Sequence, residues 1–181
     1  MSSFIKKVNS RKFRLIKLPK FDKAIDDRFA KNNWYKVNRK PDVIIFEGWC
    51  VGARPESLKT LKKSVNTMEK NDDNKLIWRK YVNDQLKKGY KKLYSKLDCL
   101  LFLRAENFSL LQKWRVIQEK KLKLKNKNKK TKQKIMTKKE VLNFMQTYQR
   151  ITQNMFKYAP KYASIVIKLN SNHQINSVKY K

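Results

Sequence analysis

The sequence has few of the residues that metal centres and disulfide frameworks require. It contains two cysteines, Cys50 and Cys99, which form no CxxC pair, and one histidine, His173. No zinc site with normal ligand spacing can be assembled from this set. Each cysteine stands beside an expected strand, so we predict reduced, buried thiols in a cytoplasmic protein.

Long apolar runs and glycines are also scarce. No run approaches the ~20 residues of a membrane span, and the basic amino terminus lacks the apolar core of a signal peptide. These absences predict a protein without a membrane segment. Of the three glycines, Gly48 and Gly52 follow the same apolar run, where we expect the backbone to bend sharply or to approach a ligand closely.

Negative charge is in short supply, and the net charge is +32. The excess consists of 37 Lys against 9 Arg, with 16 Asn beside them, which an AT-rich coding sequence produces without selection for a partner. The charge nevertheless attracts nucleic acid and other polyanions non-specifically and in a salt-dependent way. Residues 120–134 hold nine Lys and no acid, which indicates a mobile basic loop or a frayed extension of the preceding helix.

Short apolar runs separated by amphipathic segments predict an α/β fold. Three runs are typical of strands buried on both faces, at 43–46, 99–103 and 163–169. We therefore expect a three-layer parallel sheet flanked by helices. The expected domains are a basic segment at 1–12 and a single α/β domain at 13–181, with a basic lid-like loop at 120–136.

Helix signals lie between these strands. Apolar and aromatic residues at three- and four-residue steps predict a helix over 76–96, whose stripe begins at Trp78 and Tyr81 and is expected to be core. Asn107 is expected to cap the helix that carries Trp114, and Thr137 with Glu140 forms a capping box for a helix that ends at about 160. The expected extended segments outside the central sheet are 13–18 and 174–180.

The stretch from Asp42 to Glu56 is the centre of this arrangement. Four apolar residues, Val43 to Phe46, lead to Glu47 and Gly48. Because ligands bind at the carboxyl ends of strands in open α/β sheets, Glu47 is a candidate site residue. A buried strand followed by a plain turn is the alternative.

A second charged stretch precedes it. Lys20 to Arg28 gathers three acids, two Lys and one Arg within nine residues. Such runs are usually solvated surface loops, and the residues alone leave that interpretation open.

The order of these pieces resembles the D-glycerate 3-kinase family of P-loop kinases, relatives of uridine and pantothenate kinases. The resemblance covers about residues 15–170, and FEGWCVGARP, at 46–55, is its most specific part. It continues through the following segments: Lys20-Phe-Asp-Lys-Ala-x-Asp-Asp-Arg28, Val65-Asn-x-x-Glu69, Trp78-Arg79, Val82-Asn83, Leu86, Tyr90, Trp114-Arg-x-x-Gln-Glu-x-x-Leu122, Phe144, Tyr148, Arg150 and Thr152.

One part of the family pattern is missing. Such kinases carry a G-x-x-x-x-G-K-[ST] loop after an amino-terminal strand, which cradles phosphates with backbone N–H groups. Here no two glycines are five apart and none precedes Lys-Ser or Lys-Thr. The chain resembles the carboxyl-terminal half of such a kinase, without the first strand, the phosphate loop and the first helix.

The resemblance implies roles for the residues that remain. Glu47 would help to hold Mg²⁺ and orient the reacting oxygens of ATP. A lid over the nucleotide would contain Arg115 as a catalytic cation, with Gln118 and Glu119 positioning it; for Arg115, pairing within its own helix is the alternative. A small hydroxy acid such as D-glycerate would bind at Asp22, Lys23, Asp26, Asp27, Arg28 and Arg54.

Three hypotheses follow from the sequence. The first is ATP-dependent phosphotransfer to a small hydroxyl acceptor by a kinase half that is inactive alone and needs a separately encoded amino-terminal half. The second is a non-catalytic protein that binds nucleic acid or another polyanion on a kinase-derived scaffold. The third is a non-functional remnant, against which the intact FEGWCVGARP stretch argues.

Overall fold

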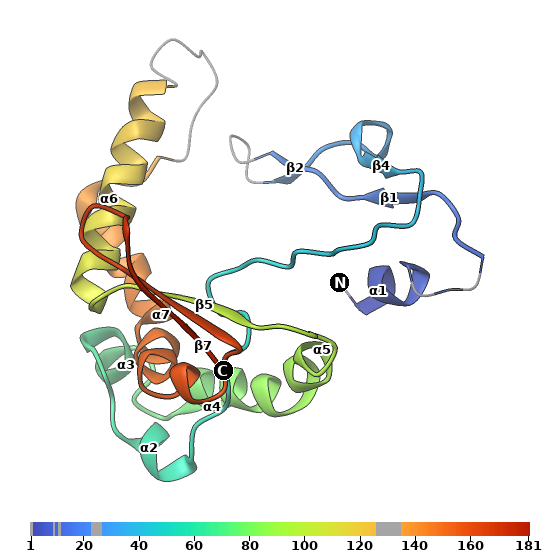
Figure 1. The fold of residues 1–181 in the computed structure, drawn as a ribbon. Coiled ribbons are helices and arrows are strands. Elements are labelled where there is room, and N and C mark those ends of the chain that lie inside the picture. The colour runs from blue at the N-terminus through green and yellow to red at the C-terminus, as the bar shows by residue number, and fades with distance from the viewer. Residues whose placement is uncertain (1, 9, 11, 23–26, 126–134) are drawn as a thin grey trace. The chain divides into compact units, whose positions relative to one another are not determined.

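The computed structural model describes residues 2–8, 10, 12–22, 27–125 and 135–181. The described residues fall into two compact units. We call residues up to Glu47, together with Ile135, the amino-terminal unit, and residues 48–125 and 136–181 the main unit. Each is described separately (Figure 1).

The amino-terminal unit consists of short elements. It contains two antiparallel strand pairs, in which Ile16 lies opposite Val37 and Phe21 lies opposite Arg28. The predicted extended segment at 13–18 is thus partly a strand. Its elements in order are helix α1 Ser2–Val8, strands β1 Ile16–Leu18, β2 Phe21–Asp22 and β3 Asp27–Arg28, the 3-10 turn η1 Lys31–Asn33, and strand β4 Tyr35–Val37.

The predicted strand at 43–46 is not formed. Val43 is 76% exposed and Ile45 86% exposed, and neither belongs to a strand. A β-strand needs a hydrogen-bonded neighbour, because its backbone groups are otherwise satisfied by water alone. Among the described residues this run has no such neighbour, so its apolar side chains stay in solvent.

The main unit has an α/β architecture, with helices around a three-stranded sheet in the order β5-β6-β7. The α/β class is confirmed, and β5 and β6 are parallel as predicted, but β7 runs antiparallel to β6 and makes the sheet mixed. Its elements are α2 Leu58–Lys62, α3 Thr67–Asn71, α4 Ile77–Gln85, the π-helical turn η2 Leu86–Tyr90, α5 Lys91–Tyr94, β5 Leu101–Arg104, α6 Phe108–Lys125, α7 Lys138–Tyr158, the 3-10 turn η3 Ala159–Lys161, β6 Ile165–Leu169 and β7 Ile175–Tyr180.

Local signals in the sequence account for the helix ends. The Thr137 side chain accepts the backbone N–H of Glu140, whose own side chain accepts the N–H of Thr137, so the predicted capping box is present. Asn107 accepts the N–H of Leu110, as predicted for the start of α6. In the part of the chain that the structure describes, no helix is both long and apolar enough to cross a membrane.

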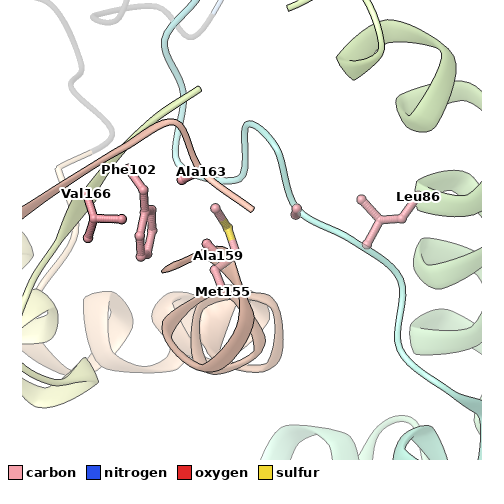
Figure 2. Close-up of a cluster of buried hydrophobic side chains, with 7 residues drawn as sticks. Leu86, Phe102, Met155, Ala159, Ala163 and Val166 are labelled. Atoms are coloured by element: carbon pink, nitrogen blue, oxygen red, sulfur yellow. The ribbon is translucent and has the colours of Figure 1, made fainter. Parts of the chain in front are cut away.

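The core lies between the sheet and α7. Phe102 of β5 and Val166 of β6 point toward the helix that carries Met155, and Ala159 and Ala163 complete the cluster (Figure 2). Small residues at 159 and 163 let the chain leave α7 and enter β6 at close range. This packing fixes α7 against one face of the sheet.

The aromatic stripe predicted as core over 76–96 is largely exposed. Trp78 is 68% and Tyr81 56% exposed, whereas Arg79 and Asn83 of the same helix are buried. The prediction was wrong because Arg79 and Asn83 have hydrogen-bond partners in Glu69 and Glu56, and these contacts turn their side of α4 inward.

Candidate functional site

Side chains from two helices brace the turn that follows Glu47. Trp49 Nε1 donates to Thr152 Oγ1 at 2.9 Å, and the Trp49 ring lies 5.1 Å from that of Tyr148. The Tyr94 hydroxyl donates to the carbonyl of Cys50 at 2.9 Å. FEGWCVGARP is thus anchored by side chains from α5 and α7.

At both glycines of this turn, an added Cβ would come close to another side chain of the same protein. Gly52 has φ of +81°, and a Cβ there would lie 2.7 Å from the Leu100 side chain. A Cβ on Gly48 would lie 3.1 Å from Val51, and the third glycine, Gly89, sits in a helical turn with nothing near. Gly52 therefore serves close packing, and the three glycines do not form a phosphate-binding loop.

The turn reaches the amino ends of the parallel strands. The Tyr162 hydroxyl donates to the carbonyl of Gly52 at 2.9 Å, and Tyr162 lies three residues before β6. The Arg54 guanidinium stacks on the Tyr162 ring at 3.7 Å, and its backbone carbonyl accepts from Asn154. Arg54, a predicted acceptor-binding residue, thus sits where β6 begins.

A buried ion network stands beside this turn. Glu69 of α3 accepts Arg150 Nε at 2.7 Å and Arg150 Nη2 at 2.6 Å, a two-pronged pair between α3 and α7. Arg79 Nη1 donates to the same carboxylate at 3.1 Å. Arg150 also reaches Glu56 at 3.2 Å, and Arg79 Nε lies 3.5 Å from Asp73.

The charges of this network hold one another in the ionised state. Burial raises the pKa of Glu69, but the hydrogen bonds and charges of Arg150 and Arg79 outweigh it, so the pKa falls below its usual value. Burial lowers the pKa of Arg150, but Glu69 and Glu56 raise it by more, so the pKa lies above its usual value. Burial also raises the pKa of Asp73, but hydrogen bonds from the backbone N–H groups of Trp78 and Arg79 outweigh this effect and lower the pKa.

A cavity of about 360 Å³ adjoins the network. That volume is within the range of small-molecule sites. Arg54 is the predicted site residue that lines it. Its other lining residues are Glu56, Leu61, Met68, Glu69, Asp72, Asp73, Trp78, Arg79, Val82, Asn83, Leu86, Thr147, Arg150, Ile151 and Asn154.

The predicted lid residues lie on α6. Arg115 and Glu119 form an ion pair at 2.5 Å within this helix, which is the alternative that the sequence left open for Arg115. The second carboxylate oxygen of Glu119, Oε2, is buried without a hydrogen-bond partner. Gln118 is exposed. Next to them, Trp114 stacks on His173 at 4.0 Å and donates to the carbonyl of Ser171, which docks the β6–β7 turn on α6.

Apart from Arg54, the predicted acceptor residues that the structure describes lie in the amino-terminal unit, as does Glu47. Asp22 and Asp27 are opposite one another in the β2–β3 pair, and Arg28 follows with its backbone N–H bonded to Asp27. Lys23 and Asp26 lie outside the described residues. Glu47 is exposed, and the described residues contain no cluster of three metal-ligating side chains.

The thiols differ from the prediction. Both cysteines are free; Cys50 is half-buried, but Cys99 is exposed because it precedes β5 on the surface. Burial raises the pKa of the Cys50 thiol to about 11, which makes it a poor nucleophile.

Comparison with known proteins places these features on a kinase scaffold. The chain is 31% identical over 139 residues to the uncharacterized kinase mug58 of Schizosaccharomyces pombe, covering 74% of this chain and 47% of that protein. Its structure is similar to D-glycerate 3-kinase from Cryptococcus neoformans var. grubii, with a TM-score of 0.76 and 22% identity, over 99% of this chain and 64% of that one.

A second solved structure, of the YGR205w protein, matches with a TM-score of 0.62 and 20% identity over 99% of this chain and 62% of that one. No profile of a known protein family matches the chain. The chain spans about half the length of the curated relative that it matches. The predicted resemblance to glycerate-kinase-like P-loop kinases is confirmed, and this chain corresponds to part of their fold.

Proposed function

We propose that this chain is one part of a kinase that transfers a phosphoryl group from ATP to a small hydroxy acid such as D-glycerate. A phosphate-binding loop, which residues 1–181 do not contain, completes it. The observation that carries the proposal is the match of 99% of the chain to 64% of a D-glycerate 3-kinase, with every glycine engaged in packing or helix.

The acceptor would bind through its carboxylate. Arg54 supports this role because it lines a cavity of suitable volume and its guanidinium lies over the Tyr162 ring. A planar cation held in one orientation suits a carboxylate. Arg28 and Lys23 are further candidate cations, and Asp22, Asp26 and Asp27 are candidate partners for the hydroxyl groups of the acceptor.

ATP and Mg²⁺ would supply the phosphoryl group and neutralise its charge. The proposed contribution of this chain is the carboxylate of Glu47 toward the metal and the cation Arg115 in the lid. Arg115 is held by Glu119 in the present state, so lid closure would require this ion pair to open or to swing as a unit.

The test is reconstitution. The chain alone, mixed with ATP, Mg²⁺ and D-glycerate, is expected to form no phosphoglycerate, because positioning and phosphate neutralisation make up nearly all catalysis of this reaction. Addition of the part of the Cryptococcus kinase that this chain does not match should restore turnover. In the restored enzyme Arg54→Ala should raise KM for glycerate, whereas the exposed Arg14→Ala should not. Activity of the chain alone, or an inactive mixture whose two parts are bound, would refute the proposal.

Polyanion binding is the second candidate, and the net charge of +32 favours it. It predicts that RNA or DNA binding stays tight at physiological salt and weakens when Lys127, Lys129, Lys130 and Lys132 are changed to Gln. Binding that vanishes at that salt would mean that the charge acts only through non-specific attraction.

A further inference from the structure

The exposed side of α4 and of the π-helical turn η2 carries aromatic rings. Trp78 is 68%, Tyr81 56% and Tyr90 47% exposed. The sequence predicted this stripe in the core, where large aromatic side chains usually have most of their surface. A group of exposed rings of this kind marks a surface that contacts another molecule.

The buried side of the same helix fixes this exposure. Arg79 and Asn83 are held inward by hydrogen bonds to Glu69 and to the backbone of Glu56. Because a helix has about 3.6 residues per turn, burial of Arg79 directs the adjacent Trp78 toward solvent. A rotation of α4 that covered Trp78 would pull Arg79 away from its carboxylate partner. The exposure of the rings is therefore a stable property of the main unit.

Neighbouring rings restrain one another. The Trp78 and Tyr81 rings meet edge to face, with centroids 6.4 Å apart and planes at 84°. The Tyr90 ring lies 5.7 Å from that of Tyr94, whose hydroxyl donates to the carbonyl of Cys50. Side chains that are already ordered lose less conformational entropy when a ligand binds. The rings are thus prepared to stack on a flat ligand.

Positive charge is interleaved with the rings. Residues 75–96 contain seven Lys, and the side chain of each is exposed. The same segment contains one acid, Asp84, which lies 3.9 Å from Lys87. Exposed Lys residues therefore exceed acids by six, seven minus one, over this segment. The seven are Lys75, Lys80, Lys87, Lys88, Lys91, Lys92 and Lys96.

We infer that these three rings and seven Lys residues, which we call the aromatic–lysine face, bind single-stranded nucleic acid. Aromatic side chains that stack on bases, combined with cations that neutralise the phosphates, are the means by which proteins bind single strands without sequence preference. In a duplex the base faces are already stacked on one another, so a single strand is the better ligand. The inference goes beyond the proposed phosphotransfer and does not depend on it.

Two other partners fit this face less well. A second copy of the chain would bring seven Lys residues against seven others, and like charges across an interface oppose association. An anionic membrane would attract the Lys residues, but binding in its surface also needs a broad apolar side on the helix. The exposed aliphatic residues of α4 are Ile77 and Val82, and its other side is buried in the protein.

The first experiment measures the contribution of stacking. The probe is a fluorescein-labelled strand of about 15 nucleotides, as oligothymidylate and as oligouridylate, a length within the site sizes of single-strand-binding domains. It is titrated with the full chain at physiological salt. Trp78→Ala and Tyr81→Ala should each weaken binding about 5- to 100-fold, the range expected for loss of one stacked base.

Tyr180→Ala is the matched control. Tyr180 is 72% exposed and lies between two Lys residues at the end of β7, so it has similar exposure and charge outside the aromatic–lysine face. Its substitution should leave the affinity unchanged. Circular dichroism melts check that all variants are folded, since substitutions of exposed residues should change stability little.

The second experiment varies the salt concentration. Lys80→Gln and Lys88→Gln should each reduce the slope of log Kd against log salt by about 0.7, because each removes one phosphate contact with a single strand. Trp78→Ala should leave that slope unchanged, since a neutral ring releases no counterion. A loss of affinity at constant slope is specific to stacking.

Several results would overturn the inference. The first is an absence of binding at physiological salt, and the second is equal affinity of Trp78→Ala and Tyr180→Ala. The third is binding that only the Gln substitutions at 127, 129, 130 and 132 remove, which would assign it to the Lys run. Sedimentation with phosphatidylserine vesicles, or a dimer that Tyr81→Ala dissociates, without oligonucleotide binding would identify a membrane or a second copy as the partner. These measurements use neither ATP nor a hydroxy acid, so the proposed phosphotransfer is tested separately.

Discussion

Glu69 is the residue whose loss should damage the main unit most. Its carboxylate accepts four hydrogen bonds, from Arg150 Nε and Nη2, from Arg79 Nη1, and from the backbone N–H of Val65 at 3.0 Å. The Arg150, Arg79 and Glu69 side chains are each no more than 7% exposed. Glu69→Ala would therefore leave two guanidinium groups inside the protein with much of their compensating charge gone.

The expected cost is large for a single substitution. Breaking a buried ion pair by removal of one partner costs about 3–5 kcal/mol, because the other charge stays buried. Glu56 and Asp73 still face Arg150 and Arg79, which argues for the lower part of that range. For a domain of this size the loss corresponds to a drop in Tm of about 6–20 °C.

Thermal and urea unfolding of the purified chain measure this directly. The control is Glu106→Ala, since Glu106 is exposed and its loss should change stability by about 0.5 kcal/mol or less. An Asn83→Ala variant tests a neighbouring buried polar group without a charge. If Glu69→Ala and Glu106→Ala melt at the same temperature, the network does not hold α3 against α7.

Acid should unfold the protein through the same residue. The folded pKa of Glu69 is lowered, so its contribution is complete above its ordinary value of about 4.3 and is lost as pH falls below that, through the folded pKa. The Glu69 contribution should therefore stay constant from pH 6 to about 4.3 and fall below that, and Glu69→Gln should flatten the falling part of the stability curve. An unchanged slope in Glu69→Gln would contradict the assignment.

Other substitutions probe the braced turn and the thiols. Gly52→Ala should lower the free energy of unfolding by about 1–3 kcal/mol, because Gly52 has positive φ and an added Cβ would meet Leu100. Gly89→Ala should raise it by about 0.5–1 kcal/mol, since Gly89 lies in a helical turn with open space around it. Equal effects of the two substitutions in urea melts would refute this account. With Ellman's reagent at pH 8, Cys99 should react at once and Cys50 only on unfolding, because a thiol with a pKa of about 11 is roughly one part in a thousand ionised there. Rapid reaction of two thiols in the folded chain would count against it.

Local signals in the sequence predicted what local interactions decide. The capping box of Thr137 and Glu140, the Asn107 cap and the strands around Phe102 and Val166 all appear where expected. Each depends on residues a few positions apart or on an apolar run long enough to be buried. The prediction failed at Val43–Phe46, since a strand exists only when another strand supplies its hydrogen bonds.

Long-range partners explain what the sequence did not reveal. The charges of Glu69, Arg79 and Arg150 were not assigned to a site, because a charged residue on a helix is ordinarily solvated. All three lie in segments that match the kinases, and that coincidence was the available signal. It could have predicted that α4 turns Arg79 inward and exposes Trp78.

The distances along the chain between bonded partners have a consequence for synthesis. Glu69 and Arg150 are 81 residues apart, and Gly52 and Tyr162 are 110 apart. At about 5–20 residues per second on the ribosome, Glu69 waits roughly 4–16 s for its partner. During that interval Arg79 and the FEGWCVGARP turn have emerged without α7 to hold them. The nascent chain therefore depends on its last third, and a ribosome that stalls within the Lys run at 120–134 would leave a product in which the braced turn lacks its contacts with Tyr148, Thr152 and Tyr162.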